Sequence, residues 1–412
     1  MLTKYKLGDL IEVTRGMSLP GEYYSETGEY IRLTMGNFNY NGGGFKENTS
    51  KTDIYYVGPI RNEFVLNKGD IITPLTEQAI GLLGTTAMIP ESGKYIQSQD
   101  VALITCKENM IDKFFCYYLI SSDIVKKQLS AAAQQTKIRH TSPDKIKDCK
   151  VWIPDLDLQR KIGRVLSDID KKISLNTRMN AELEAMAKQL YDYWFVQFDF
   201  PDENGKPYKS SGGKMVYNEK LKREIPEGWE SSILIDIANI TMGQSPDGSS
   251  YNENGKGIIF YQGSSDFGIR FPSVRMFTTE PSRFASKGDI LMSVRAPVGD
   301  TNIANTDCCI GRGLAALNSK INSITYLYFI LGYLKSKFDV LNSIGTTFGA
   351  ITKDELFSLP VVKPNSHILQ KFEDICSPIF DEQMKIGYEI EELNRLRDSL
   401  LPMLMNGQIT VE

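Results

Sequence analysis

The stretch LGDLIEVTRGMS, residues 7–18, decides the fold because the chain repeats it. It returns 227 positions later as LIDIANITMGQS, residues 234–245, with the same leucine, aspartate, threonine, glycine and serine at matching places. The same offset carries Ile31 onto Ile258. A period of this length is too long for a solenoid. The sequence therefore predicts two large, diverged halves built on one architecture.

Later segments repeat as well, with a changed offset. KGDII at residues 68–72 returns as KGDIL at residues 287–291. The run PDLDLQRK at residues 154–161 returns as PNSHILQKF at residues 364–372, with an offset of 210 for the proline and 211 for the glutamine. Each half therefore carries the same parts in the same order.

The globular part of each half reads as a mixed α/β fold of the α+β kind. Short β-rich stretches alternate with Gly, Asn, Pro and Ser clusters, which is typical of strands joined by tight turns. The clearest are GEYIRL, GDIITPL, YIQSQDVALITC, GIIFYQG and GDILMSV. Helical apolar spacing covers Ile111–Leu129 and Ser323–Leu341, at matching places in the two halves. We expect the aromatic residues of these two helices to belong to the cores.

A long helix with a seven-residue apolar repeat is expected to end each half. In the first helix the two repeating positions hold Ile162, Ile169, Asn176, Leu183 and Leu190, and Val165, Lys172, Met179, Met186 and Tyr193. In the second helix they hold Phe372, Ile379, Ile386, Leu393 and Leu400, and Cys376, Gln383, Ile390, Arg397 and Leu404. This repeat is typical of helices that pack as a coiled coil, with Asn176 and Gln383 as candidates for fixing the register. The alternative is that each helix lies on its own domain.

Connectivity predicts the direction of these helices. The first helix leaves the first domain at its N-terminal end, and the second helix starts at the second domain. Helices that pack along their length must then be antiparallel, with a pseudo-two-fold axis within one chain. About 37 residues at 1.5 Å each separate the domains by roughly 55 Å. Two similar domains at a fixed spacing suit the reading of two DNA half-sites, although a two-headed protein-interaction scaffold would have the same geometry.

Composition places the chain among cytoplasmic proteins with no membrane segment. The first residues, MLTKYKLGDL, lack the apolar stretch of a signal peptide, and no run approaches 18 apolar residues. Six cysteines without paired spacing predict reduced, mostly buried thiols, and two histidines are too few for the usual metal sites. The net charge is −4, and residues 361–412 carry nine acidic and five basic side chains. The rest of the chain is balanced, so composition alone neither favours nor excludes DNA.

Signatures of catalysis are missing from the sequence. An adenine methyltransferase needs a (D/N)PP(Y/F/W) element, and the chain contains no Pro-Pro pair. A motor needs GxxxxGK(S/T), which neither GGKM at Gly212 nor GKGI at Gly255 supplies. His140 and His367 have no Cys or Ser motif around them, so a structural role in solvent is expected for both. We therefore expect a subunit without catalytic activity of its own.

The central motif identifies a family resemblance. LYDYWFVQFDFPDENGKPYKSSGG at Leu190–Gly213, followed by IPEGWE at Ile225–Glu230, resembles the specificity (S) subunit of type I restriction-modification systems, as do the paired KGDI and LQ(R/K) motifs. The resemblance covers essentially the full chain. It implies a bipartite reader of double-stranded DNA that docks onto methyltransferase (M) subunits, two of them expected, and restriction (R) subunits. S-adenosylmethionine, ATP and Mg²⁺ are then expected only in those partners.

The resemblance also implies an order of domains. The expected parts are target-recognition domain 1 (residues 1–154), conserved helix 1 (155–200), a linker (201–230), target-recognition domain 2 (231–364) and conserved helix 2 (365–412). The helices are expected to set the spacer between two half-sites and to dock the methyltransferase. Within the linker, residues 201–223 are rich in Gly, Lys and Ser and read as exposed chain.

Base edges are read by Arg, Lys, Asn, Gln, Ser and Thr, which nominates two matching segments. The first domain offers Gln134, Gln135, Thr136, Lys137, Arg139 and His140, directly after its predicted helix. The second domain offers Thr346, Thr347 and Lys353 at the corresponding place. Differing chemistry at matching positions is what two readers of different half-sites need. The alternative is that both segments are solvated loops.

Arginines near strand ends are weaker candidates, because such side chains often pair with nearby acids. They are Arg15, Arg32, Arg270, Arg275, Arg283, Arg295 and Arg312.

Partner binding is expected at an aromatic cluster where the first long helix ends, because aromatic residues are enriched in interface cores. The cluster comprises Tyr191, Tyr193, Trp194, Phe195, Phe198 and Phe200. The alternative is that it packs against the second domain.

Overall fold

The computed structural model describes residues 2–39, 43–77, 81–132, 139–343 and 349–411. The chain divides into two compact units. Unit 1 comprises residues 1–174 and 391–412, and unit 2 comprises residues 175–390. The boundary falls inside two long helices, α5 (Leu156–Tyr191) and α9 (Ser366–Met405), so each helix contributes a segment to both units.

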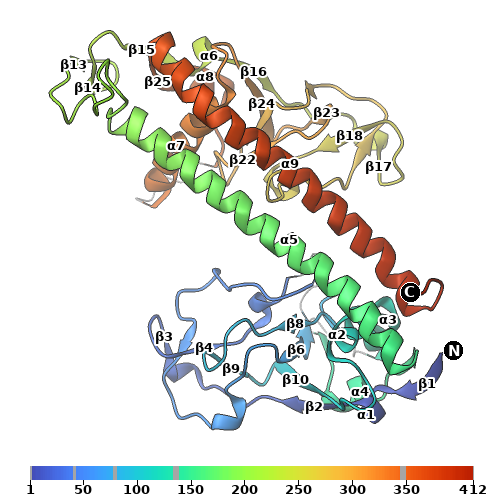
Figure 1. Cartoon of the computed structure of the whole chain (residues 1–412). Helices are drawn as coiled ribbons and strands as arrows, with labels where there is room; N and C mark the ends of the chain where they lie inside the picture. Colours follow the sequence, from blue (N-terminus) through green and yellow to red (C-terminus); the bar gives the residue numbers. More distant parts are fainter. Residues whose placement is uncertain (1, 40–42, 78–80, 133–138, 344–348, 412) are drawn as a thin grey trace. The chain divides into compact units, whose positions relative to one another are not determined.

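A four-stranded antiparallel sheet forms the centre of unit 1 (Figure 1). Its strands, in order across the sheet, are β2 (Ile11–Arg15), β10 (Val101–Cys106), β6 (Ile71–Pro74) and β8 (Ala87–Met88). Successive side chains of a strand point to opposite faces. Ala102 and Ile104 of β10 therefore join one core, with α2 (Lys113–Ser121) and α3 (Asp123–Ala132), while Val101 joins a second core on the other face.

The second core of unit 1 lies against a smaller sheet. Its strands are β3 (Tyr24–Ser25), β5 (Tyr55–Tyr56), β4 (Tyr30–Arg32) and β9 (Tyr95–Ile96), with β4 and β9 parallel. The remaining pairs are β1 (Thr3–Lys6) with β12 (Lys150–Ile153), and β7 (Thr76–Glu77) with β11 (Arg139–His140). Two short helices, α1 (Leu7–Leu10) and α4 (Pro143–Lys147), complete the unit.

Unit 2 repeats this plan. Its four-stranded sheet is β16 (Ala238–Met242), β24 (Leu314–Ser319), β21 (Ile290–Ser293) and β22 (Thr301–Ile303). The second sheet is β17 (Tyr251–Asn252), β19 (Phe277–Thr278), β18 (Ile258–Tyr261), β23 (Cys308–Ile310) and β20 (Phe284–Ala285). The remaining elements are β15 (Glu230–Ile233) paired with β25 (Pro360–Lys363), α6 (Leu234–Ile237), α7 (Ile324–Ser343) and α8 (Lys353–Phe357).

The predicted repeat is confirmed at the level of strand register. Leu103 lies opposite Thr14 in unit 1, and Ala316 lies opposite Thr241 in unit 2. Thr14 and Thr241 are 227 positions apart, the offset of the repeated stretch. The mixed α/β fold class is likewise confirmed in both units.

One predicted correspondence was wrong by a residue. Ile31 lies opposite Tyr55, and the matching place opposite Phe277 is held by Ile259 rather than Ile258. Unit 2 has one more residue between β17 and β18 than unit 1 has between β3 and β4, so the offset rises by one there.

The two predicted amphipathic helices differ in continuity. In unit 1 the helix breaks at Ser122, whose backbone is extended and whose hydroxyl donates to the Leu119 carbonyl at 2.6 Å. In unit 2 α7 runs unbroken to Ser343. The predicted single helix over Ile111–Leu129 is therefore two helices in unit 1.

The long helices pack against each other, as predicted. In unit 2, Asn176 donates to Glu389 at 2.7 Å, and Gln383 donates to the Asn180 carbonyl at 3.2 Å. As numbers rise along α5 they fall along α9, so these segments are antiparallel. Asn176 and Gln383 are both buried in the seam, where their amides bond across it. Amides held in this way disfavour a shifted register.

The apolar repeat of α5 was assigned one residue off at its second position. In unit 2 the seam is formed by Asn180, Ala187 and Trp194, which are buried, rather than by Met179, Met186 and Tyr193. The latter three are exposed large hydrophobic residues. Two apolar stripes run along this helix, and periodicity alone does not tell which one faces the partner.

The segment predicted as an exposed linker has its own structure. Strands β13 (Met215–Asn218) and β14 (Arg223–Pro226) form a hairpin. Phe200 stacks between Tyr208 and Trp229, with ring centroids 4.7 and 4.9 Å away. Phe200 and Trp229 are buried at the two ends of the segment, whereas most of residues 203–222 are exposed. The predicted exposure is therefore confirmed, and the segment differs from the prediction only in having regular structure.

All six cysteines are free thiols, as predicted, and five are buried. No helix within the described residues combines the length and apolar character needed to cross a membrane.

Candidate nucleic-acid interface

Each unit has a polar cleft between its two sheets and the loops that join them. The cleft of unit 1 encloses about 460 Å³. Its lining residues are Leu19, Tyr24, Arg32, Leu33, Thr34, Met35, Gly36, Asn48, Ser50, Lys51, Thr76, Ser98, Gln99, Asp100 and His140. The cleft of unit 2 encloses about 870 Å³. Its lining residues are Gln244, Ser245, Pro246, Gly248, Tyr251, Gln262, Gly263, Ser264, Ser265, Arg295, Ala296, Arg312 and Gly313.

Backbone hydrogen bonds show that the two clefts are the same feature of the repeat. The Leu75 amide donates to the Asp100 carbonyl at 2.8 Å, and the Val294 amide donates to the Gly313 carbonyl at 2.9 Å. These bonds tie the strand after the KGDI motif to the loop before the central strand in both units. The two clefts therefore have the same walls.

A tyrosine forms one wall of each cleft. The hydroxyl of Tyr24 donates to the Leu19 carbonyl, and that of Tyr251 donates to the Pro246 carbonyl, both at 3.0 Å. Each bond reaches back five residues and fixes the ring. A tyrosine fixed by the same hydrogen bond therefore lines the cleft of both units.

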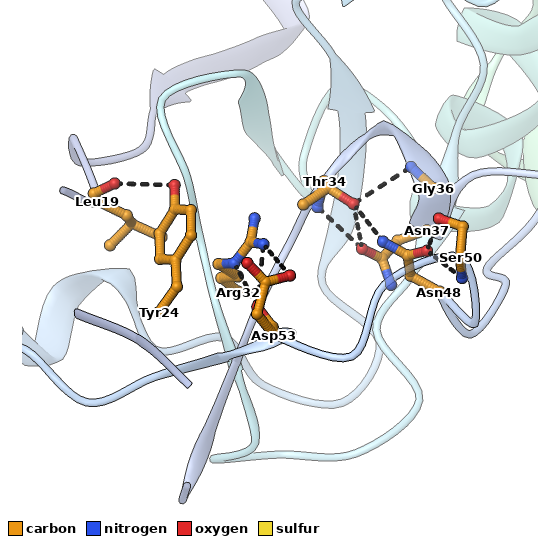
Figure 2. Close-up of polar contacts among 9 residues, drawn as sticks. All are labelled: Leu19, Tyr24, Arg32, Thr34, Gly36, Asn37, Asn48, Ser50 and Asp53. Atoms are coloured by element: carbon orange, nitrogen blue, oxygen red, sulfur yellow. Dashed lines mark hydrogen bonds and ion pairs between the residues drawn. The ribbon is translucent and has the colours of Figure 1, made fainter. Parts of the chain in front are cut away.

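Arg32, a predicted DNA contact, is instead held within the wall of the unit 1 cleft (Figure 2). Its Nε and Nη2 donate to the Asp53 carbonyl at 3.1 and 3.0 Å, and its guanidinium lies 3.7 Å from the ring centroid of Tyr24. The side chain is only 6% exposed. In unit 2 the equivalent strand position holds Phe260, whose ring packs on Tyr251 at 4.9 Å. The position therefore supports the tyrosine, with or without a positive charge.

A short turn after β4 forms the second wall of the unit 1 cleft, and side chains make it rigid. Asn37 accepts the Thr34 amide at 2.8 Å, and the Thr34 hydroxyl accepts the Gly36 amide at 3.3 Å. Asn48 donates to the same hydroxyl at 2.9 Å, as Figure 2 shows. The Thr34 and Asn48 side chains thus line the cleft in fixed positions.

The corresponding turn of unit 2 is held by a buried carboxylate. Asp266 accepts the Gln262 amide at 2.7 Å, and Arg275 donates its Nε to the same carboxylate at 3.0 Å. Arg275, another predicted DNA contact, is therefore engaged in holding the turn.

Three positions of the clefts differ in chemistry between the units. Thr76 and Arg295 each stand eight residues after the lysine of their KGDI motif. Gln99 and Arg312 each stand two residues before the start of the equivalent central strand. His140 pairs with Thr76 in a short strand pair, where Ala350 pairs with Arg295. Equal walls with unequal polar groups are what two readers of different sequences require.

Several predicted base-reading residues lie outside the described part of the chain, namely Gln134, Gln135, Thr136, Lys137, Thr346 and Thr347. Arg139 is described, and it forms an ion pair with the buried Glu77 at 3.1 Å. Lys353 lies over the ring of Phe357, 5.2 Å from its centroid. Arg139 is thus a local anchor.

Two further arginines have local partners. Arg15 donates to the Gln99 carbonyl at 2.9 Å, beneath the cleft loop of unit 1. Arg270 is buried, with its guanidinium 3.0 Å from Glu184 and 4.4 Å from the ring centroid of Phe380. Arg270 is therefore a core residue and was wrongly predicted to reach DNA. An acid 86 positions away in the sequence engages it, so local spacing gave no signal.

The aromatic cluster predicted to bind partners is mostly core. Tyr191, Trp194, Phe195, Phe198 and Phe200 are all buried. They pack with Tyr326, Phe329, Phe372 and Trp229 of unit 2. Packing against the second domain, the alternative considered for this cluster, is what the structure shows. Burial of large rings in one place is favoured because each removes a large apolar area from water.

Tyr193 is the exception in that cluster, because it is exposed. With Met179 and Met186 of α5 it forms an exposed stripe with a spacing of seven residues, and Tyr193 itself lies in the π-helical turn Asp192–Val196 that continues α5. We call these three residues the outer stripe. Met186 and Tyr193 line a shallow hollow together with Leu190 and Gln197.

Comparisons with known proteins identify the family of this chain. The profile of the type I restriction modification DNA specificity domain matches residues 2–185 and again residues 226–392. A Methanocaldococcus jannaschii protein assigned as the MjaX type I restriction enzyme specificity subunit is 31% identical over 383 residues, covering 88% of this chain and 84% of that protein. The HindI specificity subunit of Haemophilus influenzae is 24% identical, covering 76% of this chain and 81% of that protein.

A solved structure has a similar fold. The crystal structure of the type I restriction-modification system S subunit from M. genitalium matches with a TM-score of 0.59 and 18% identity. The match covers 98% of this chain and 96% of that one.

Proposed function

The chain belongs to the type I restriction modification DNA specificity family, and we propose that each of its two units reads one half of a bipartite DNA target. It is the DNA target-recognition subunit of a type I restriction-modification complex. The observation that carries the two-reader proposal is the pair of clefts, whose walls are equivalent and whose polar side chains differ. A protein-interaction scaffold would have no need for such matched sites.

The clefts have the chemistry that base edges require. Amide, hydroxyl and guanidinium groups line them, and these groups hydrogen bond to base edges in the major groove. Their backbones are held by hydrogen bonds that Tyr24 donates and that Asn37 and Asp266 accept, so little conformational freedom is lost on binding. Each cleft is thus preorganised to read a few base pairs.

Catalysis belongs to partner subunits in this proposal. The chain lacks the sequence signatures of a methyltransferase and of a motor. S-adenosylmethionine, ATP and Mg²⁺ are accordingly bound by the methyltransferase and restriction subunits. Two methyltransferase subunits fit the two-fold repeat, with the outer stripe as one docking site. Helices α5 and α9, which both contribute to the two units, set the spacer between half-sites.

The test of the two-reader proposal is a map of DNA modified in a host that expresses this chain with its methyltransferase subunit. We expect one bipartite, asymmetric sequence. Replacing residues 1–154 by the first domain of another family member should change one half of that sequence and leave the other half intact. A change in both halves, or modification without any sequence preference, would contradict the proposal. S-adenosylmethionine binding by this chain alone would contradict the proposal that catalysis belongs to the partner subunits.

A further inference from the structure

Two arginines in the cleft of unit 2 stand apart from the arginines that have local partners. Arg295 and Arg312 are both exposed, and both line the cleft. Within the described residues neither side chain has a carboxylate partner or a hydrogen-bond acceptor. No acidic residue is among the described residues that line this cleft. The cleft therefore presents two uncompensated guanidinium groups to whatever enters it.

Four other arginines differ from Arg295 and Arg312 in this respect. Arg32, Arg139, Arg270 and Arg275 all have an acidic partner within 3.3 Å. The fold thus neutralises these four arginines within its own structure. Two positive charges that line one cleft repel each other, and a ligand that accepts hydrogen bonds would offset this repulsion.

The backbones that carry these two arginines are fixed. Arg295 lies in a bridge with Ala350, and the amide of Ala296 donates to the Gly349 carbonyl at 3.1 Å. The Arg312 amide donates to the Ser245 hydroxyl at 3.3 Å. The backbone of each arginine is therefore held in place, while its guanidinium group has no hydrogen-bond acceptor among the described residues. This combination suits specific recognition rather than a loose electrostatic attraction.

Unit 1 places uncharged groups at the same two positions. Thr76 stands where Arg295 stands, and Gln99 stands where Arg312 stands. Arginine forms bidentate hydrogen bonds with the O6 and N7 atoms of guanine, whereas glutamine forms them with the N6 and N7 atoms of adenine. The exchange between the units is thus an exchange between two kinds of base-reading side chain.

We propose that Arg295 and Arg312 read guanine bases, so that the half-site recognised by unit 2 contains at least one G·C pair specified by this cleft. The inference rests on the proposed function and deepens it. It names the residues that determine specificity and the base that they select. The equivalent cleft of unit 1 selects through Gln99 and its neighbours and does not use arginine.

The experiment uses the complete complex of this chain with its methyltransferase. The variants are Arg295→Ala, Arg312→Ala and Arg312→Lys, and Arg283→Ala is the matched control. Arg283, an arginine that the sequence also nominated, is exposed in unit 2 but does not line the cleft, so base reading by the cleft does not involve it. The half-site of unit 2 is identified as the half that survives replacement of residues 1–154. Methylation rates are then measured on duplexes in which each G·C pair of that half is changed to A·T.

We expect Arg312→Ala and Arg312→Lys each to lose roughly tenfold or more in preference for G·C at one position. Neither alanine nor lysine can form the bidentate hydrogen bonds of a guanidinium group. Arg295→Ala should lose a preference in the same half-site. The other half-site and the Arg283→Ala control should be unchanged.

Two results would overturn the inference while leaving the two-reader proposal intact. One is an unchanged half-site in the arginine variants. The other is weaker modification of every sequence alike, with Arg312→Lys restoring it, since that pattern marks a phosphate contact. Failure of the proposed function would look different, because the unaltered complex would then modify no bipartite sequence.

Discussion

In each unit an equivalent tyrosine contacts the long helices. The contact is made with a carboxylate in unit 1 and with an aromatic ring in unit 2. Tyr118 of α2 and Tyr328 of α7 are 210 positions apart, the offset of the repeat at this point. In unit 1 the Tyr118 hydroxyl donates to Asp170 of α5 at 2.5 Å, and the same carboxylate pairs with Arg397 of α9 at 3.0 Å. Burial and the negative charge of Asp170 raise the pKa of Tyr118, which keeps its hydroxyl protonated as a donor.

In unit 2 the place of that carboxylate is taken by an aromatic ring. Phe380 of α9 packs edge-on against Tyr328, with ring centroids 5.8 Å apart. The charge comes from the recognition domain instead, because Arg270 lies over both rings and pairs with Glu184 of α5. The repeat thus preserved the place where each domain meets its helices and changed the interactions made there. Each domain is therefore matched to its own helix segments.

The largest effect is expected from Glu184→Ala. Arg270 is 4% exposed at its side chain, and the substitution removes its carboxylate. An uncompensated buried cation typically costs about 3–5 kcal/mol. We expect the lower part of that range, because Glu184 is itself 37% exposed. Urea unfolding of the full chain measures it.

Glu182→Ala is the matched control, two residues away on α5. Glu182 pairs with Arg178 at the surface, and exposed pairs contribute at most about 1 kcal/mol. Equal losses in stability for the two variants would show that the Arg270 contact is not an anchor of unit 2.

Asp170→Asn should have the next largest effect. It leaves an acceptor for Tyr118 and removes the negative charge beside Arg397, which keeps the flanking Asp398 as a partner. Because this second carboxylate remains, we expect a loss of about 1–2 kcal/mol, less than for Glu184→Ala. Denaturant unfolding compares the two.

Asp168→Asn serves as the control for this variant, since it removes only an exposed pair with Lys171. A loss for Asp170→Asn no greater than that of the control would mean that the carboxylate does not anchor unit 1.

The smallest effect on stability is expected from Met186→Glu in the outer stripe. Met186 is 59% exposed, and exposed substitutions usually change stability by less than about 0.5 kcal/mol. If the stripe docks the methyltransferase, the variant should recover much less of that subunit when the two are expressed together and purified. Unaltered recovery with Met186→Glu would remove the stripe from the docking surface, and Met179→Glu would then test the rest of it.

Much of the architecture was predictable because its signals are local. Residues 7–18 and 234–245 repeat in sequence, so the repeat of the fold follows from the amino-acid order alone. The β-rich stretches located some of the strands, among them β4, β6, β10, β18 and β21, and apolar spacing located both long helices. The choice between Met186 and Ala187 for the seam of α5 was not local, since both positions have the same spacing and only the packing partner distinguishes them.

The candidate site was predictable in kind and only partly in detail. The two arginines that line the cleft of unit 2, Arg295 and Arg312, were among the candidates. Nothing in their neighbourhood distinguished them from Arg270, which is engaged by an acid 86 positions away. The cleft itself brings Thr76, Gln99 and His140 together from three separate segments, and sequence distance concealed this proximity.

The sequence by itself determined that the chain is a diverged tandem repeat with two long helices and that it resembles the specificity subunits. These properties follow from motifs and periodicities that span a few residues each. Only the tertiary structure decided which arginines are paired, which aromatic rings are core and where the two clefts lie. Ion pairing and burial depend on residues brought together across the chain, so their free energies are set by distance in space rather than along the sequence.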